Sequence, residues 1–237
     1  LRQNGVVYGV AWNYENISVD HIRIDNLKDI EKLRGSKYLQ SHVGNTYNRV
    51  KKDIHENKKV LFVGTPCQVA AINNLICSEN LFTVDLICHG VPSLMVFRQY
   101  LKENFDTIID SVDFRNKKKG WKNYFVKIQN NYYPHPRNPF FKGFLDNLYL
   151  NDICYYCPFS KIPRVGDITL GDYWGVPKEV DNDNKGVSAV LVNNEKGEKL
   201  FNNILDNIVF FEQDLEVIKK GNPRLYLGHN NNFELKL

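Results

Sequence analysis

The chain has 237 residues, with 31 Lys and Arg against 27 Asp and Glu, a formal net charge of +4 and 43% hydrophobic residues. This length predicts one or two domains with a sizeable core, and the composition is ordinary for a soluble globular protein. The weak, scattered positive charge gives no nucleic-acid footprint. No apolar run approaches the roughly 18 residues of a membrane helix, so we expect a cytoplasmic protein that binds neither nucleic acid nor membrane.

The first half of the chain alternates predicted strands and helices. The sequence opens at Leu1 and its only methionine is Met95, so we expect it to be a piece of a longer polypeptide. Apolar runs and alternation predict strands at residues 6–12, 18–24, 59–63 and 81–87, and spacing and capping predict helices at 26–35, 43–57, 65–76 and 93–105. Strand–helix repeats of this kind imply parallel pairing through right-handed crossovers.

The pattern changes after residue 107. Alternation predicts a hairpin at 111–115 and 124–128, followed by a helix at 138–150, a loop at 154–163, strands from 167 and at 187–192, a helix at 195–207 and a loose polar tail from Asn222. The sequence therefore predicts an α/β protein with a mostly parallel sheet core and a smaller β-rich, cysteine-bearing part. We expect domains of residues 1–106 and 107–237 that pack as one unit.

Four of the five cysteines stand where a metal centre would need them: Cys67, Cys88, Cys154 and Cys157. Two single cysteines that follow predicted strands, together with a distant Cys-x-x-Cys pair, are typical of a four-cysteine site for an iron-sulfur cluster or for zinc. One alternative is a Cys67–Cys88 disulfide, which the odd cysteine count and the chain length disfavour. The other is a thioredoxin-like redox pair at Cys154 and Cys157, which lacks the preceding strand and following helix of that type. Cys77 follows an apolar helical run, so we expect it in the core.

Two predicted strand ends carry further candidates. Cys67 falls in the first turn of its helix, where unpaired backbone donors and the helix dipole favour a thiolate. Thr65 is a natural helix cap, and Gln68 either reaches the edge of a ligand or lies exposed. His89 either ligates a metal, donates a hydrogen bond near the site or is a plain turn residue.

The second half of the chain carries weaker candidates. Trp121, with the basic run 117–119, either holds an anionic tail under its ring or closes a solvated hairpin loop. Asp167 and Asp172 either bind a ribityl or ribose hydroxyl or serve as turn and cap residues.

Several motifs together resemble the beta-subunit family of coenzyme F420 (8-hydroxy-5-deazaflavin) hydrogenases and dehydrogenases. They occur in the family's order, from about Leu1 to Val192. The motifs are Gly35-Ser-Lys-Tyr38, Gly64-Thr-Pro-Cys-Gln68, Asp85-Leu-Ile-Cys-His-Gly-Val-Pro-Ser93, Phe114-Arg-Asn-Lys117 with Gly120-Trp121, Cys154-x-x-Cys157 and Asp167-Ile-Thr-Leu-Gly-Asp-Tyr-Trp-Gly175.

The resemblance implies an oxidoreductase subunit that is both an iron-sulfur protein and a flavoprotein. A 4Fe-4S cluster would be held at the four cysteine positions, and FAD would lie beside Ser36 and Lys37. In the family, electrons pass from a ferredoxin, an attached ferredoxin-like domain or other hydrogenase or dehydrogenase subunits through the cluster to FAD, and then as hydride to the deazaflavin, or in reverse. No catalytic residue is assigned.

The flavin position follows from the strand order and the resemblance together. Open α/β sheets bind ligands at the carboxyl ends of their strands, and helix N-termini such as that at Thr65 favour anions. We therefore expect FAD between the segment 35–38 and the turn after Gly64, with Lys37 facing its phosphates or ring.

Two departures from the family leave a rival function open. The N-terminal ferredoxin-like domain and the Ser-Gly-Gly stretch of the family's flavin phosphate pocket are not in this sequence. Many bacterial relatives belong to polysaccharide-synthesis functions in organisms without the deazaflavin, so the acceptor is open. The rival is a non-enzymatic, zinc-stabilised module in a polysaccharide-biosynthesis complex.

Overall fold

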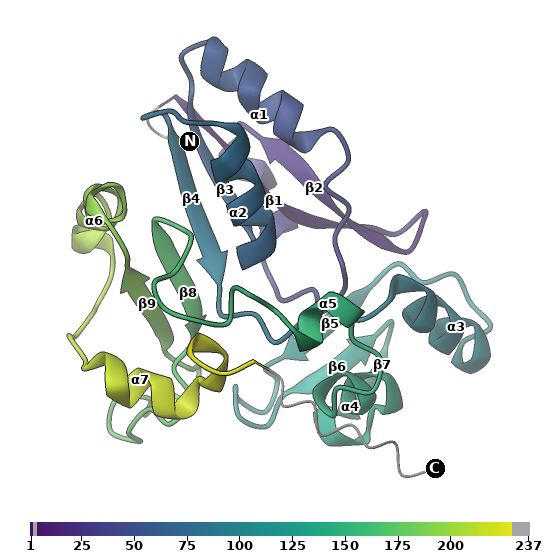
Figure 1. The fold of residues 1–237 in the computed structure, drawn as a ribbon. Helices are drawn as coiled ribbons and strands as arrows, with labels where there is room; N and C mark the ends of the chain where they lie inside the picture. Colours follow the sequence, from purple (N-terminus) through teal and green to yellow (C-terminus); the bar gives the residue numbers. More distant parts are fainter. Residues whose placement is uncertain (2–3, 229–237) are drawn as a thin grey trace.

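A six-stranded sheet forms the centre of the fold (Figure 1). The computed structural model describes residue 1 and residues 4–228. The strands are β1 (Gly5–Asn13), β2 (Ser18–Ile24), β3 (Lys59–Gly64), β4 (Leu81–Leu86), β8 (Ile168–Asp172) and β9 (Ser188–Val192), in the order β2-β1-β3-β4-β8-β9. β1, β3, β4 and β8 run parallel, while the edge strands β2 and β9 are antiparallel to their neighbours. The predicted α/β fold with a mostly parallel core is confirmed.

Two helices of the first half cover one face of this sheet. The helical elements there are η1 (Leu27–Leu33), α1 (Thr46–His55), α2 (Pro66–Leu75) and α3 (Leu94–Asn104). Val50 of α1 and Val69 and Ile72 of α2 are fully buried in the same cluster as Phe62 of β3. α2 begins at Pro66, which has no backbone N–H to leave unpaired in a first turn. Apolar burial therefore holds α1 and α2 against the strands that position the site.

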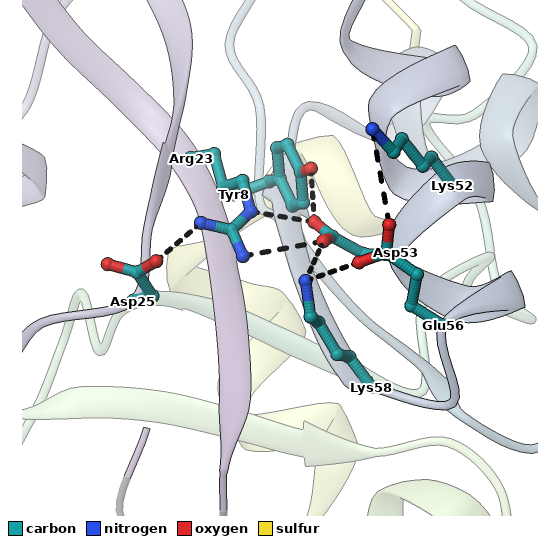
Figure 2. Close-up of polar contacts among 7 residues, drawn as sticks. All are labelled: Tyr8, Arg23, Asp25, Lys52, Asp53, Glu56 and Lys58. Carbon is teal, nitrogen blue, oxygen red and sulfur yellow. Dashed lines mark hydrogen bonds and ion pairs between the residues drawn. The ribbon is translucent and has the colours of Figure 1, made fainter.

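α1 is also tied to the sheet by a cluster of charges around Asp53 (Figure 2). The buried Asp53 carboxylate accepts hydrogen bonds from the Tyr8 hydroxyl at 2.6 Å, from Arg23 Nε at 2.7 Å and from Lys58 Nζ at 2.9 Å. Arg23 also pairs with Asp25, and Lys58 with Glu56, each at 2.7 Å. We call these six residues the Asp53 cluster. Each of its charges has a partner of opposite sign.

A three-stranded antiparallel sheet forms the second layer of structure. It comprises β5 (Val112–Asn116), β6 (Phe125–Ile128) and β7 (Asn131–Pro134), followed by the short η2 (His135–Arg137) and α4 (Pro139–Leu145). Its core is aromatic, with Phe97 of α3, Phe114 of β5 and Phe140, Phe141 and Phe144 of α4 all buried. The predicted hairpin is confirmed. The sequence missed β7, whose residues show no buried alternation.

The helix predicted over 138–150 is shorter than expected. α4 ends at Leu145, because Asp146 leaves the helix and Asn147 takes a left-handed conformation with φ of 61°. A one-turn helix, α5 (Asp152–Tyr155), stands where a loop beginning at Cys154 was predicted. Asn151 caps it by accepting a hydrogen bond from the Ile153 amide at 3.3 Å.

The last part of the described chain packs against the body of the protein. It contains α6 (Glu195–Asn202), η3 (Leu205–Asn207), α7 (Leu215–Gly221) and η4 (Pro223–Leu225). The prediction of a loose tail from Asn222 is wrong for residues 222–225, because Asn222 is 3% exposed and Leu225 is 0% exposed. Its last part, residues 229–237, lies outside the described residues. Leu225 fills a core cluster with Trp121 and Tyr173, and this contact holds η4 in place.

Residues of the second half complete the sheet of the first half. β8 pairs with β4 and carries β9 at the edge, so the large sheet takes strands from both sides of residue 106. The division into domains at 106/107 stays a prediction. In the part of the chain that the structure describes, no helix has the length and apolar character needed to cross a bilayer.

Candidate metal and cofactor site

Cys67 and Cys88 lie at the carboxyl ends of neighbouring parallel strands. Cys67 is exposed in the first turn of α2, directly after β3, and Cys88 follows β4 by two residues. The Thr65 hydroxyl lies 3.1 Å from Cys67 Sγ, within hydrogen-bonding distance of sulfur. Figure 1 shows β4 pointing toward α5 and the three-stranded sheet, so this edge faces the rest of the protein.

α5 brings the Cys-x-x-Cys pair to the same edge. Cys154 belongs to α5, and Cys157 follows its C-terminal end. Gly90 permits the close approach, because a Cβ built on it would lie 3.3 Å from the Cys154 Cβ and 3.0 Å from Leu150 Cδ1. Its φ of +139° also disfavours other residues. The glycine of the Cys-His-Gly motif therefore lets the Cys88 loop pack against the helix that carries Cys154.

The four thiols act on one another electrostatically. Burial raises the pKa of the Cys88 thiol to about 12, and Cys67, Cys154 and Cys157 shift it in the same direction. Burial, Cys157 and Cys67 likewise raise the pKa of Cys154. Backbone hydrogen bonds from Gly90 to Cys88 and from Val91 to Cys154 oppose both shifts, because they stabilise thiolates. The Cys88 and Cys154 thiols therefore hold their protons more firmly when no cation is bound.

The donor set suits a thiolate-bound metal centre in its chemistry. All five cysteines are free thiols, so the alternative of a Cys67–Cys88 disulfide is not realised. Over residues 1 and 4–228, no three or more His, Cys, Asp or Glu side chains are arranged to hold a single metal ion. A four-iron cluster is larger than one ion and separates its cysteine ligands more widely. The four thiols act on one another electrostatically without being arranged around a single ion, and backbone amides donate hydrogen bonds to Cys88 and Cys154. Both features fit such a cluster.

Neighbouring candidates lie outside the thiol group. Cys77 is exposed, so its predicted place in the core is wrong. α2 ends at Leu75 and Ile76 is already extended, which places Cys77 in the surface connection to β4. The His89 ring packs edge-on against Phe144, with centroids 4.9 Å apart.

An open pocket lies beside the segment predicted to meet the flavin. Its volume is about 770 Å³, and its lining includes Gly35, Ser36, Trp12 and Tyr14. The rings of Trp12 and Tyr14 stack at 5.4 Å with an angle of 12° between their planes. Ser36 is exposed on the rim. The pocket thus combines a stacked aromatic pair with a polar and charged rim that includes Arg34 and Asp113.

Lys37 holds the loop that lines this pocket. Its ammonium group donates hydrogen bonds to the carbonyl oxygens of Leu33 at 3.2 Å, Arg34 at 2.7 Å and Gly35 at 3.1 Å. Burial lowers the pKa of Lys37 to about 8, against an opposing effect of Asp113. All three of its donors are therefore used within the protein, and the predicted contact with phosphates would require their rearrangement.

The loop then connects the pocket to two of the three thiol-bearing segments. Gln68 accepts a hydrogen bond from the Thr65 amide at 3.0 Å and donates one to Ser41 Oγ at 2.9 Å. Asn151 Nδ2, at the cap of α5, donates to Gln40 Oε1 at 3.3 Å. Thr65 and Gln68 thus hold the start of α2 and its contact with the loop. This is a positioning role beside Cys67, and it uses one hydrogen bond to the oxygen and one from the nitrogen of the Gln68 amide.

Asp172 and Trp121 meet different partners from those expected. Asp172 forms an ion pair with Arg115 at 2.9 Å, and the Arg115 guanidinium lies 4.1 Å above the Tyr124 ring. Trp121 is 1% exposed, and its indole N–H donates to Asp181. Its ring packs 4.7 Å from that of the half-exposed Trp174. Trp121 is therefore a buried support, not a surface that a ligand reaches.

Sequence reasoning missed three buried arginines around the site. Arg115 lies within one of the family motifs, but its contacts depend on the fold. Arg164 forms a fully buried ion pair with Asp85 at 3.2 Å and donates to the carbonyls of Leu86 at 3.0 Å and Phe159 at 2.7 Å. Asp85 precedes Cys88 and Arg164 follows Cys157, so this pair joins the two cysteine loops. Arg224, the third, had no sequence signal.

The comparisons with known proteins agree with this architecture. A family model, described as the C terminus of the coenzyme F420 hydrogenase/dehydrogenase beta subunit, matches residues 57–217, which is more than half of the chain. The chain belongs to this family. The four cysteines lie within the matched residues, whereas Ser36 and Lys37 precede them and Arg224 follows them.

The family gives an oxidoreductase context, and a solved structure shares the fold. A chain of the F420-reducing NiFe hydrogenase complex from Methanosarcina barkeri superimposes with a TM-score of 0.58 at 15% sequence identity, over 92% of this chain and 76% of that chain. At this identity the likeness concerns the fold alone. Comparison with curated protein sequences gives no match.

Proposed function

We propose that the protein is an oxidoreductase subunit that passes electrons between a 4Fe-4S cluster and FAD. The observation that supports this proposal is that three separate segments bring four thiols close enough to act on one another electrostatically, next to a loop that also lines an aromatic pocket. Cys67, Cys88, Cys154 and Cys157 would hold the cluster, which supplies one-electron redox chemistry when bound.

The chain's own residues would keep the thiolates in place. The Gly90 and Val91 backbone amides hydrogen-bond to Cys88 and Cys154, and the Thr65 hydroxyl lies beside Cys67. The Asp85–Arg164 pair holds the Cys157 loop against β4. Such contacts favour the charged form of sulfur and so help the thiols release their protons to a bound centre.

The flavin would lie in the pocket against Trp12 and Tyr14, with Ser36 at its rim. Lys37 would hold the loop shape, Gln68 would connect the loop to α2, and Asp172 would be kept in place by Arg115. The buried Trp121 ring would hold the Trp174 ring in place by packing against it.

The electron partners would be a ferredoxin, a ferredoxin-like domain or other hydrogenase or dehydrogenase subunits, with coenzyme F420 or another hydride acceptor at the flavin. This assignment rests on the family. The cytoplasmic location stays a prediction.

Anaerobic purification of the complete polypeptide, followed by iron, sulfide, zinc and flavin analysis, tests the proposal. We expect four iron and four sulfide per chain, bound FAD and broad visible absorption. A colourless protein that contains zinc and no flavin would contradict it and support the zinc-stabilised module instead.

A further inference from the structure

The C-terminal turn η4 lies directly on the cysteine edge. Arg224, in this turn, is 9% exposed, and its Nε donates to the Cys88 carbonyl oxygen at 3.3 Å. One of its terminal nitrogens donates to the Leu227 carbonyl at 3.1 Å. Arg224 thus contacts the backbone of Cys88, which lies 136 positions earlier in the sequence and is predicted to bind the cluster.

Among the residues that the structure describes, Arg224 has no carboxylate partner of the kind that Arg115 and Arg164 have. Arg115 pairs with Asp172 at 2.9 Å, and Arg164 pairs with Asp85 at 3.2 Å. Over the described residues, no carboxylate forms a salt bridge with Arg224. The groups that act on it electrostatically are Cys157, Cys88 and Cys154.

A buried cation requires a partner of opposite charge. Burial without such a partner is strongly unfavourable, and arginine stays protonated at any ordinary pH. An iron-sulfur cluster held by four cysteines carries a net negative charge and would supply that partner. The Arg224 environment is therefore complete only when the site carries negative charge.

We propose that Arg224 is the dedicated counter-cation of the four-cysteine site, positioning the Cys88 loop and stabilising the more negative, reduced state of the cluster. This proposal rests on the proposed function. Reduction adds one electron, without making or breaking a bond, and the donor is a low-potential one-electron carrier. A fixed positive charge in a poorly solvated region stabilises the added negative charge, and it therefore raises the midpoint potential.

The test uses the full chain, reconstituted anaerobically with iron and sulfide. Its variants are Arg224→Gln, which removes the charge, and Arg224→Lys, which keeps it. Arg98→Gln is the matched control, because Arg98 also donates to two backbone carbonyls, of Asn16 at 2.6 Å and Ile17 at 3.3 Å, but on the exposed surface of α3. Cluster content is measured by iron and sulfide analysis, and the midpoint potential by dithionite titration monitored by electron paramagnetic resonance.

We expect a lower midpoint potential in Arg224→Gln, a potential close to wild type in Arg224→Lys and no change in Arg98→Gln. Equal potentials in wild type and Arg224→Gln would overturn the proposal, as would an equal fall in both Arg224 variants. If Arg224→Gln assembles little cluster, recovery of cluster content in Arg224→Lys supports the role of charge, and failure of both variants contradicts it. A wild-type chain that binds no cluster would instead refute the proposed function, and this proposal with it.

Discussion

The Asp53 cluster and the four-cysteine site are two groups of ionisable side chains with opposite electrostatic character. In the Asp53 cluster every charge has a partner, and, although burial opposes it, hydrogen bonds from Arg23, Lys58 and Tyr8 lower the pKa of Asp53 to about 2 (Figure 2). At the cysteine edge, burial and neighbouring thiols raise the pKa of Cys88. A satisfied cluster stabilises the fold, whereas a cluster of like groups with raised pKa values is typical of a functional site.

Removing one thiol should produce the largest effect that separates the two regions. Cys157→Ser should lower bound iron several-fold, because a four-cysteine site loses one ligand. Cys77→Ser is the matched control and should retain wild-type iron, since Cys77 is exposed on the connection from α2. Iron analysis after anaerobic reconstitution checks this. Equal iron loss in both variants would refute the assignment of the spare cysteine.

Breaking the buried pair beneath the site should affect both stability and iron. Asp85→Asn leaves the fully buried Arg164 without a counter-charge, which costs about 3–5 kcal/mol. It should also loosen the Cys157 loop and lower iron content, and urea unfolding together with iron analysis measures the two effects. A stable variant that fails to bind iron would agree with the positioning role, whereas unchanged stability and iron would contradict it.

Asp53→Asn should destabilise the protein without affecting the cysteine site. The folded-state pKa of about 2 lies below the ordinary value of 3.8, so ionised Asp53 contributes roughly 2 kcal/mol above about pH 4. This contribution is lost as the pH falls from about 4 to about 2. Urea unfolding of wild type and variant at several pH values should show a difference that shrinks across this window. A constant difference, or iron loss in the variant, would break the contrast between the two regions.

Lys37→Ala should give the smallest effect, on flavin binding. The variant removes three hydrogen bonds that hold the loop beside the pocket, so FAD affinity should fall by about one order of magnitude, corresponding to roughly 1.4 kcal/mol. Fluorescence titration of the complete polypeptide measures it, with Lys51→Ala on the exposed side of α1 as control. Unchanged FAD affinity would show that Lys37 plays no part in flavin binding.

The sequence predicted the sheet core well because its strands are marked by apolar runs and its helices by caps. The apolar runs at β1, β3 and β4, the alternation at β2 and the proline at the start of α2 follow local rules. Local rules also place Cys67 and Cys88 at strand ends. They fail for Cys77, because the end of α2 at Leu75 moves it to the surface.

The remainder of the site depends on tertiary contacts that no periodicity records. Arg224 stands in a polar stretch that local rules treat as loose, and Leu225 anchors it through packing against Trp121. From the sequence, Trp121 is available as a ligand platform, whereas in the fold the loop that contains Asp181 covers it. Gln68 and Lys37 are likewise free polar groups by sequence, yet both bind the loop 34–42.

Protection of the thiols is the most direct test that Cys67, Cys88, Cys154 and Cys157 share one centre. The reconstituted, full-length protein is alkylated with iodoacetamide under anaerobic conditions, and each cysteine is quantified by mass spectrometry before and after iron is removed by a chelator. We expect that Cys77 alone is modified in the loaded protein and that all five cysteines react, after denaturation, once iron is removed. Modification of any of the four in the loaded protein to the same extent as Cys77 would contradict the shared centre.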